Sequence, residues 1–210
     1  MNPLTAPRRR RKEARPAEIA TAALEVFAEK GFSAAKLDEV AQRAGVSKGT
    51  LYLYFSSKEE LFKAMVREAV LPNLQEMEGW VASFQGSSAD LLRQFLSRTA
   101  TRITQQRLGR IPKMIIAEAG NFPDLAQFWV DEFVSRMQHL LNSVLERGFA
   151  AGEFREAGAQ TAMLVLSPIL VMALWNAAIG PAVGRSLDPE QWARDAAELL
   201  LQGLASKEAA

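Results

Sequence analysis

The chain has 210 residues, of which 49% are hydrophobic and 23% are charged, with a net charge of +1. This length and composition are typical of a globular protein with a sizeable core and exclude an intrinsically disordered chain. The sequence has no cysteine, which excludes disulfides and thiol chemistry and suits a cytoplasmic location. Residues 1–62 carry a net charge of +3 and the remainder −2. We therefore expect a polyanion to bind at the amino-terminal part.

Residues 1–15 form a basic segment that contains two prolines and the run RRRRK at residues 8–12. This composition predicts a disordered arm. One interpretation is a solubilising tail or a loose clamp on nucleic acid. The other is an arm that follows the minor groove beside a DNA-binding domain. No long apolar stretch follows this basic start, so we do not expect a secretory signal peptide.

A first helix is expected to begin at Pro16, which suits the first turn of a helix, and to end at Gly31. Four apolar residues at helical spacing predict its buried face: Ile19, Ala23, Val26 and Phe27. This apolar stripe needs a partner, so we expect the helix to pack against the helices that follow it.

Residues 37–62 predict two short helices joined by a tight turn, followed by the start of a third helix. Four apolar residues share one face of the first of these: Leu37, Val40, Ala41 and Ala44. Gly45 suits its end, and Ser47 is a good N-cap for a second helix of about two turns. Ser57 and Glu60 have the spacing of a capping box for the third helix. This pattern is typical of a helix-turn-helix, whose second helix enters the DNA major groove.

The second helix of this motif has an apolar face and a polar face. Leu51 and Phe55 are four residues apart and are expected to face the core. The polar face offers a cation, a close backbone approach and two hydroxyls for phosphates or base edges, from Lys48, Gly49, Thr50 and Tyr52. A packing corner with a solvated polar face is the plainer interpretation.

The stretch AGVSKGTLYLYFSSKEELF resembles the DNA-binding signature of the TetR/AcrR family of bacterial transcriptional regulators, and the resemblance extends upstream to Ile19. It implies DNA contacts from these positions: Ser47, Lys48, Gly49, Thr50, Tyr52, Tyr54 and Lys58. The sequence departs from the family pattern at Tyr54, where His is common. It departs again at Ala35, where a Ser or Thr usually caps the first helix of the motif and touches a phosphate. Lys36 is a candidate to bind that phosphate instead.

Residues 63–210 predict further helices with short loops between them, and no convincing strand. The helix after the motif reaches Pro72, which either kinks it or ends it. Later apolar stripes predict helices around residues 91–103 and 114–115, and a long one over residues 124–147. Asp188 suits the N-cap of a last helix. The fold class predicted from this pattern is all-α.

Residues 157–184 contain no charged side chain and are long enough to cross a membrane. Pro168 lies within this segment, and no Lys or Arg cluster flanks either end. We therefore favour a helix buried by its own core and by a second subunit, without a membrane. The resemblance implies that the last two helices pair with their copies in a homodimer. Such a dimer would present two recognition helices to half-sites about 34–36 Å apart.

The sequence shows no recognisable catalytic or metal-binding set, and its one histidine is His139. We therefore expect no enzymatic activity, metal or cofactor. The middle of the chain is rich in Met and aromatic residues, which either fill a core or line a cavity. The resemblance implies a small, lipophilic effector there, with these candidate contacts: Phe84, Phe95, Met114, Phe128, Trp129, Phe133, Met137, Met163 and Trp175.

Together these features predict a disordered basic arm (residues 1–15), a three-helix DNA-binding domain (16–62) and a larger helical ligand-binding and dimerisation domain (63–210). The predicted function is a ligand-responsive transcriptional regulator, specifically a repressor. It would bind a palindromic double-stranded DNA operator as a homodimer and be released by the effector. The alternatives are a non-specific architectural DNA-binding protein, a membrane-anchored regulator and an enzyme. The basic arm allows the first of these, but a purely architectural role leaves the large apolar carboxy-terminal part unexplained.

Overall fold

The computed structural model describes residues 6–156 and 158–205, and side chains from Arg15 onward. Within these ranges the chain is helical, and its one β-type pairing is an isolated bridge between Phe154 and Ala205. The expected all-α class is therefore confirmed. Two compact units are present: one comprises residues up to Pro72 together with Met114–Phe128, the other Asn73–Lys113 and the residues from Trp129.

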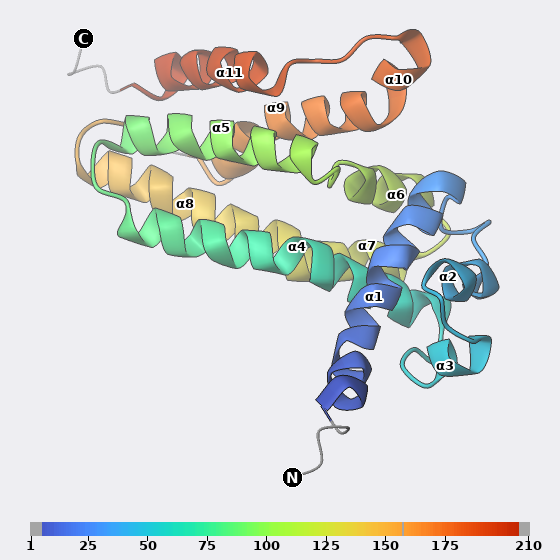
Figure 1. The fold of residues 1–210 in the computed structure, drawn as a ribbon. Helices are drawn as coiled ribbons and strands as arrows, with labels where there is room; N and C mark the ends of the chain where they lie inside the picture. Colours follow the sequence, from blue (N-terminus) through green and yellow to red (C-terminus); the bar gives the residue numbers. More distant parts are fainter. Residues whose placement is uncertain (1–5, 157, 206–210) are drawn as a thin grey trace. The chain divides into compact units, whose positions relative to one another are not determined.

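The first unit holds the helix-turn-helix. Its helices are α1 (Ala6–Lys30), α2 (Leu37–Arg43), α3 (Lys48–Tyr52), the first part of α4 (Lys58–Ser83), the end of α6 (Arg110–Glu118) and nearly all of α7 (Pro123–Trp129) (Figure 1). Four aromatic rings fill its centre, with centroids 4.9–5.8 Å apart: Phe27, Phe32, Phe62 and Phe122. The expected domain covered residues 16–62 only. The compact unit also includes α4 as far as Pro72 and the distant segment Met114–Phe128, whose Phe122 joins the aromatic cluster.

Helix α1 differs from the expected disordered arm. It begins at Ala6 and passes through Pro16, so residues 6–15 are helical. Residues 1–5 of the expected arm lie outside the described residues. The physical reason is helix propensity: Arg, Lys, Glu and Ala dominate this stretch and are among the best helix formers. One internal proline removes a single backbone hydrogen bond, which a long helix tolerates.

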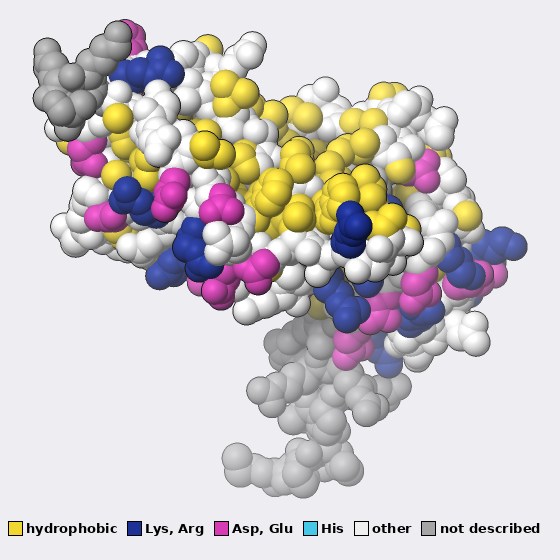
Figure 2. Space-filling model, turned by 90° about the horizontal axis from the view of Figure 1, so that it is seen from above, with side chains coloured by type: hydrophobic (Ala, Val, Ile, Leu, Met, Phe, Trp, Pro, Cys, Tyr) yellow, Lys and Arg dark blue, Asp and Glu magenta, His cyan; other side chains and the backbone are white. Residues whose placement is uncertain are grey.

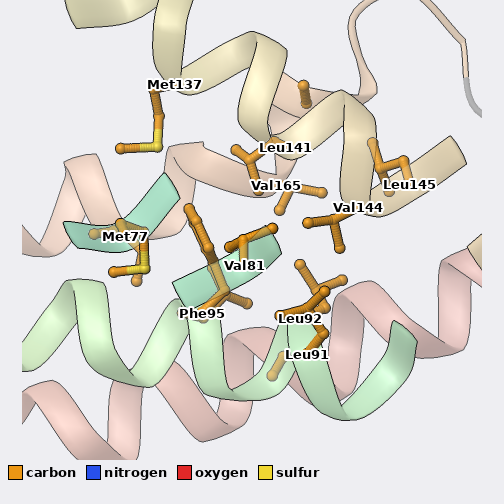
Figure 3. Packing of buried hydrophobic residues seen from close by; sticks show 14 of the residues in the cluster. Met77, Val81, Leu91, Leu92, Phe95, Met137, Leu141, Val144, Leu145 and Val165 are labelled. Atoms are coloured by element: carbon orange, nitrogen blue, oxygen red, sulfur yellow. The ribbon is translucent and has the colours of Figure 1, made fainter. Parts of the chain in front are cut away.

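The second unit is built around α5 (Ser88–Gln105), which packs against α8 (Ser135–Ala150), α9 (Thr161–Leu174) and α11 (Pro189–Leu204) (Figure 1). Leu91, Leu92 and Phe95 from α5 are fully buried. Figure 3 shows these side chains meeting Met77 and Val81 of α4 and the apolar stripe of α8. Burying such aliphatic and aromatic side chains is the main source of stability for this unit.

The long helix expected over residues 124–147 is present as one helical run with a change of pitch. It consists of α7, the π-helical turn η1 (Val130–Val134) and α8. A π turn inserts an extra residue into a helix and carries no clear signal in a single sequence. The helix after the motif is α4, which extends to Ser83 and therefore contains Pro72 in its interior.

The uncharged segment forms α9, the π-helical turn η2 (Trp175–Ile179) and the short helix α10 (Gly180–Val183). Pro168 lies inside α9, and the Ser167 hydroxyl donates to the Leu164 carbonyl at 2.8 Å, the group that a residue with an N–H at position 168 would have bonded. By length and composition Thr161–Val183 is apolar enough to span a membrane, and 28% of its most apolar window is buried within the chain. One such helix is weak support for a membrane protein, since buried helices of globular proteins have the same composition.

Candidate nucleic-acid interface and ligand site

The turn between α2 and α3 is built by local signals. Gly45 has a positive φ of 65°, a conformation that glycine adopts without strain, and the Val46 N–H donates to the Ala41 carbonyl at 2.9 Å. The Ser47 hydroxyl accepts the Thr50 N–H at 3.0 Å and lies 2.8 Å from the Thr50 hydroxyl. Ser47 is thus the N-cap that the sequence predicts. Its hydroxyl is engaged in capping and fixes where α3 begins.

Helix α3 ends at Tyr52 and is shorter than the expected two turns, but residues 48–55 together present one face to solvent and bury the other. Leu51 is fully buried and Phe55 is 6% exposed, whereas Tyr52 is 46% and Leu53 is 82% exposed. Lys48 and Gly49 are also exposed, and Thr50 is half-buried. Leu53 was absent from the predicted DNA contacts. Its position one residue after Tyr52, outside the Leu51–Phe55 stripe, was the available signal. An exposed leucine at the C-cap of a recognition helix suits apolar contact with a thymine methyl group.

Lys48 is paired with an acid of α2. Its ammonium lies 2.8 Å from Asp38 Oδ1, and both side chains remain 60% exposed. The hydrogen bond to Asp38 raises the pKa of Lys48, so this side chain stays charged. A DNA phosphate must therefore compete with, or share, the Asp38 carboxylate for this cation.

Lys58 is anchored to the loop before α2. Its ammonium donates to the carbonyls of Ser33 and Ala35, at 2.9 and 3.1 Å, and lies 4.7 Å above the Phe32 ring. An ammonium group has three N–H donors, so one donor is left for a phosphate. Lys58 thus serves this unit as a structural residue as well as a candidate DNA contact.

The first helix of the motif begins one residue later than the family pattern suggested. Its N-cap is Lys36, and Ala35, buried to 3% exposure, precedes it. The Glu39 carboxylate accepts the Lys36 backbone N–H at 3.4 Å, which partly replaces a hydroxyl cap. The Lys36 side chain is exposed and the Tyr54 side chain is half-buried, with its ring centroid 6.5 Å from that of Phe55.

The nine candidate ligand contacts are distributed over both units. In the first unit Met114 and Phe128 are buried, and the Phe128 ring lies beneath the guanidinium of Arg67 at 4.9 Å. In the second unit Phe95 and Met137 are core residues, while Phe84 and Phe133 pack against that core. Trp129 stacks on Phe133 with centroids 4.4 Å apart. Met163 is 43% exposed, and Trp175 lies in η2 with an indole N–H that has no hydrogen-bond partner among the described residues.

A cavity of about 300 Å³ does lie in the second unit, between the end of α5, the start of α6 and the turn η2. It is lined by Ile103, Thr104, Arg107, Gly109, Arg110, Ala173, Asn176 and Ala177. None of the nine predicted ligand contacts is among these residues. The lining contains two arginines, Arg107 and Arg110, whereas the sequence interpretation considered aromatic and Met residues as ligand contacts, together with three acids that weakly favour a cationic ligand: Glu118, Asp131 and Glu132.

The fold and this exposed α3 define an all-α helix-turn-helix regulator that has a separate helical domain. Residues 19–65 match the family of bacterial regulatory proteins called tetR, and residues 90–201 match the C-terminal domain of AefR-like transcriptional repressors. The second match alone covers more than half of the chain. The protein belongs to the TetR family of bacterial transcriptional regulators, a family of regulatory proteins rather than of enzymes.

Three similar proteins illustrate this relationship. The fatty acid metabolism regulator protein of Bacillus subtilis (strain 168) is 26% identical over 147 residues, which is 69% of this chain and 74% of that protein. The HTH-type transcriptional activator FasR of Mycolicibacterium smegmatis is 48% identical over 59 residues, only 28% of this chain and 27% of FasR. The structure of FadR from Bacillus subtilis in complex with stearoyl-CoA superimposes with a TM-score of 0.72 at 21% identity, covering 90% of this chain and 98% of FadR. This last similarity establishes a shared fold.

Proposed function

We propose that this protein is a cytoplasmic transcriptional repressor that binds a palindromic operator as a homodimer and is released by a small, lipophilic effector. The observation that carries this proposal is the division of α3 and the turn after it, residues 48–55, into a buried face (Leu51 and Phe55) and an exposed face (Tyr52 and Leu53). A helix that is fixed by its core contacts and exposes such side chains suits insertion into the major groove. Ser47, Lys48, Gly49 and Thr50 surround the amino-terminal end of that face.

The homodimer is supported by a large exposed apolar face on α9 to α11. Figure 2 shows hydrophobic side chains gathered over this face. The residues that contribute to it are 37–72% exposed: Met163, Leu164, Leu170, Val171, Ile179, Val183 and Leu199. Apolar patches of this kind mark interaction surfaces in soluble proteins. A second copy is the occupant we propose, because two-fold pairing doubles the base contacts of one short recognition helix.

A pair of substitutions tests the dimer and the operator together. Leu164→Glu with Val171→Glu places two carboxylates on the apolar face, so we expect a monomer by light scattering and a large loss of operator affinity. Ile116→Glu is the matched control, because Ile116 is 59% exposed on α6 and is not part of that face. A double variant that remains dimeric would refute this interface.

The operator itself is obtained by selecting bound sequences from a random DNA pool. We expect a palindrome with half-sites about one helical turn apart, bound at least a thousandfold more tightly than random DNA, at the lower end of the range of about 10³–10⁷ for specific regulators. A ratio near unity would instead favour the non-specific, architectural alternative.

The effector that we propose carries a fatty acyl chain. The support is the likeness to the fatty acid metabolism regulator of Bacillus subtilis over most of both chains, and to the fold of FadR, whose structure holds stearoyl-CoA. A ligand releases DNA only to the extent that it binds the DNA-free state more tightly than the DNA-bound state. Titrating stearoyl-CoA into the operator complex should lower DNA binding, whereas coenzyme A alone should not. Equal effects of the two compounds would exclude the acyl chain as the recognised group.

A further inference from the structure

We propose that the cavity between α5, α6 and η2 binds the anionic end group of an amphiphilic ligand through Arg107 and Arg110. The ligand class is an organic carboxylate or phosphate monoester with an apolar chain. This inference rests on the proposed function in so far as the ligand acts as the effector, but binding in the cavity is measurable without DNA.

The guanidinium groups of Arg107 and Arg110 have no hydrogen-bond or ion-pair partner among the described residues, unlike those of most other arginines in the same unit. Arg102 and Arg136 form two-pronged ion pairs with Glu76 and Glu78, respectively, at 2.6–3.2 Å. Within the described part of the chain, no hydrogen bond or ion pair links the guanidinium of Arg107 or Arg110 to another residue. Both residues line the cavity. Two unpaired guanidiniums beside one cavity attract an anion, and their planar forks match carboxylate and phosphate oxygens.

Arg107 has an energetically unfavourable backbone conformation. Its φ of 54° is the one positive value among the described residues other than glycine. Such a conformation is unfavourable for a residue with a long side chain and is more frequent at functional sites. The conformation ends α5 in a Schellman motif, in which the N–H groups of Arg107 and Leu108 donate to the carbonyls of Thr104 and Ile103 at 3.2 and 2.9 Å. Glycine is the usual residue at such a position, so an arginine here is consistent with a role for its side chain.

The rest of the cavity wall is preformed. Gly109 lies so close to α9 that a Cβ atom there would be 2.8 Å from the Ala173 carbonyl oxygen. The Asn176 side chain is fixed by two hydrogen bonds of 2.9 Å with the backbone of Leu187. The wall at Asn176 and Ala177 belongs to the π turn η2, and single π turns are frequent at binding sites.

The lining also shows which part of a ligand would fit. Ile103, Ala173 and Ala177 provide apolar surface next to the two arginines. A volume of about 300 Å³ lies at the lower limit of ligand pockets. It has room for a charged end group and the beginning of a chain, so a longer apolar chain must extend beyond the cavity.

Calorimetric titration of the full chain with three ten-carbon probes tests this site. Decanoate and decyl phosphate carry the two proposed end groups, and decanol is their uncharged counterpart. We expect the wild type to bind one or both charged probes at least tenfold more tightly than decanol. Binding of decanol as tight as that of the charged probes, or no binding of either charged probe at millimolar concentration, would overturn the proposal.

Two variants assign the binding to the arginines. Arg107→Gly removes the guanidinium while permitting the positive φ, so it should fold at least as stably as the wild type. It and Arg110→Gln should each weaken binding of the charged probe about tenfold or more, as expected for losing a charge-assisted hydrogen bond, and should leave decanol binding unchanged. Arg93→Gln is the control, because Arg93 pairs with Asp90 and does not line the cavity. Unchanged affinity in both test variants would refute the site.

DNA release separates this inference from the proposed function. If a charged probe binds through Arg107 and Arg110 but leaves the operator complex intact, the site stands and the probe is not the effector. If stearoyl-CoA releases DNA equally from the wild type and from the two variants, the repressor function stands. The anion site is then refuted as the place where that effector binds.

Discussion

Ser33 and Glu118, which are 85 positions apart in the sequence, are joined by two hydrogen bonds within the first unit. The Ser33 N–H donates to Glu118 Oε1 at 2.9 Å, and the Ser33 hydroxyl donates to Oε2 at 2.7 Å. Beside them the rings of Phe32 and Phe122 meet edge to face at 4.9 Å. The segment from Met114 to Phe128 is therefore held to the loop that follows α1. Breaking these contacts should destabilise the helix-turn-helix itself.

Replacing Glu118 by Gln should destabilise the protein in a pH-dependent manner. The hydrogen bonds from Ser33 lower the pKa of Glu118. A carboxylate with a lowered pKa stabilises the fold above its unfolded pKa, and this contribution is lost as the pH falls through the folded pKa. At pH 7 we expect Glu118→Gln to cost about 1 kcal/mol, after allowing for its partial exposure.

Urea unfolding of both proteins from pH 7 down to below pH 4 measures this effect. The difference between wild type and variant should narrow as the acid range is entered. Glu146→Gln, an exposed acid on α8, should show no such trend. A Glu118→Gln penalty that stays constant across this pH range would contradict the role of the charge.

Lys58→Met should reduce both stability and DNA binding. Methionine keeps an apolar stem next to Phe32 but cannot donate to the Ser33 and Ala35 carbonyls. We expect a loss of about 1 kcal/mol in the free energy of unfolding. If the third N–H meets a phosphate, the slope of log K against log[salt] should fall by about one unit.

Lys63→Met is a suitable comparison for Lys58→Met, because the Lys63 ammonium lies over the Phe128 ring at 5.6 Å. Calorimetry without DNA gives the stability effect, and anisotropy at several salt concentrations gives the slope. A Lys58 variant as stable as the wild type would show that the carbonyl contacts contribute little.

The predictions that succeeded rest on local physics. Ser47 caps α3, Gly45 with its positive φ follows the C-cap of α2, and Asp188 caps α11. Each of these roles depends only on residues a few positions away. The amphipathic stripes likewise identified the buried faces of α1 and α5. These features were sufficient for the all-α class and for the helix-turn-helix.

The features that were missed depend on partners that are distant in the sequence, or on the balance between small energetic contributions. Nothing near Ser33 indicates that Glu118 is its partner, and nothing near Ser88 indicates that the Glu153 carboxylate accepts its N–H at 2.9 Å. Pro16 suits the start of a helix, yet α1 begins at Ala6 and continues through Pro16 because the flanking residues favour helix. The cavity beside Arg107 depends on how α5, α6 and η2 meet, and periodicity within one helix contains no such information.

Tyr52→Phe and Leu53→Ala should affect operator recognition in different ways. If the Tyr52 hydroxyl binds DNA, its removal should cost about 1 kcal/mol, or roughly fivefold in Kd. Leu53→Ala removes an exposed apolar group, so we expect a weaker preference for thymine at one operator position. Binding to the selected operator and to single-base variants measures both effects. If both variants keep the wild-type affinity and the wild-type base preference at every operator position, Tyr52 and Leu53 do not contact the operator.

Asp38→Asn should strengthen DNA binding, because Asp38 holds the Lys48 ammonium at 2.8 Å and adds a negative charge beside the proposed interface. The hydrogen bond to Asp38 is the main reason that the pKa of Lys48 is raised. Lys48 remains protonated at pH 7 without it, so the variant gains a free cation. We expect the complex to be roughly threefold to tenfold tighter at low salt. The slope of log K against log[salt] should be steeper by up to about one unit, as for one added phosphate contact. Glu146→Gln changes the net charge equally but lies on α8 in the second unit, so it separates a local effect from a general one. If the two variants gain affinity equally, the pairing of Lys48 with Asp38 does not regulate DNA binding.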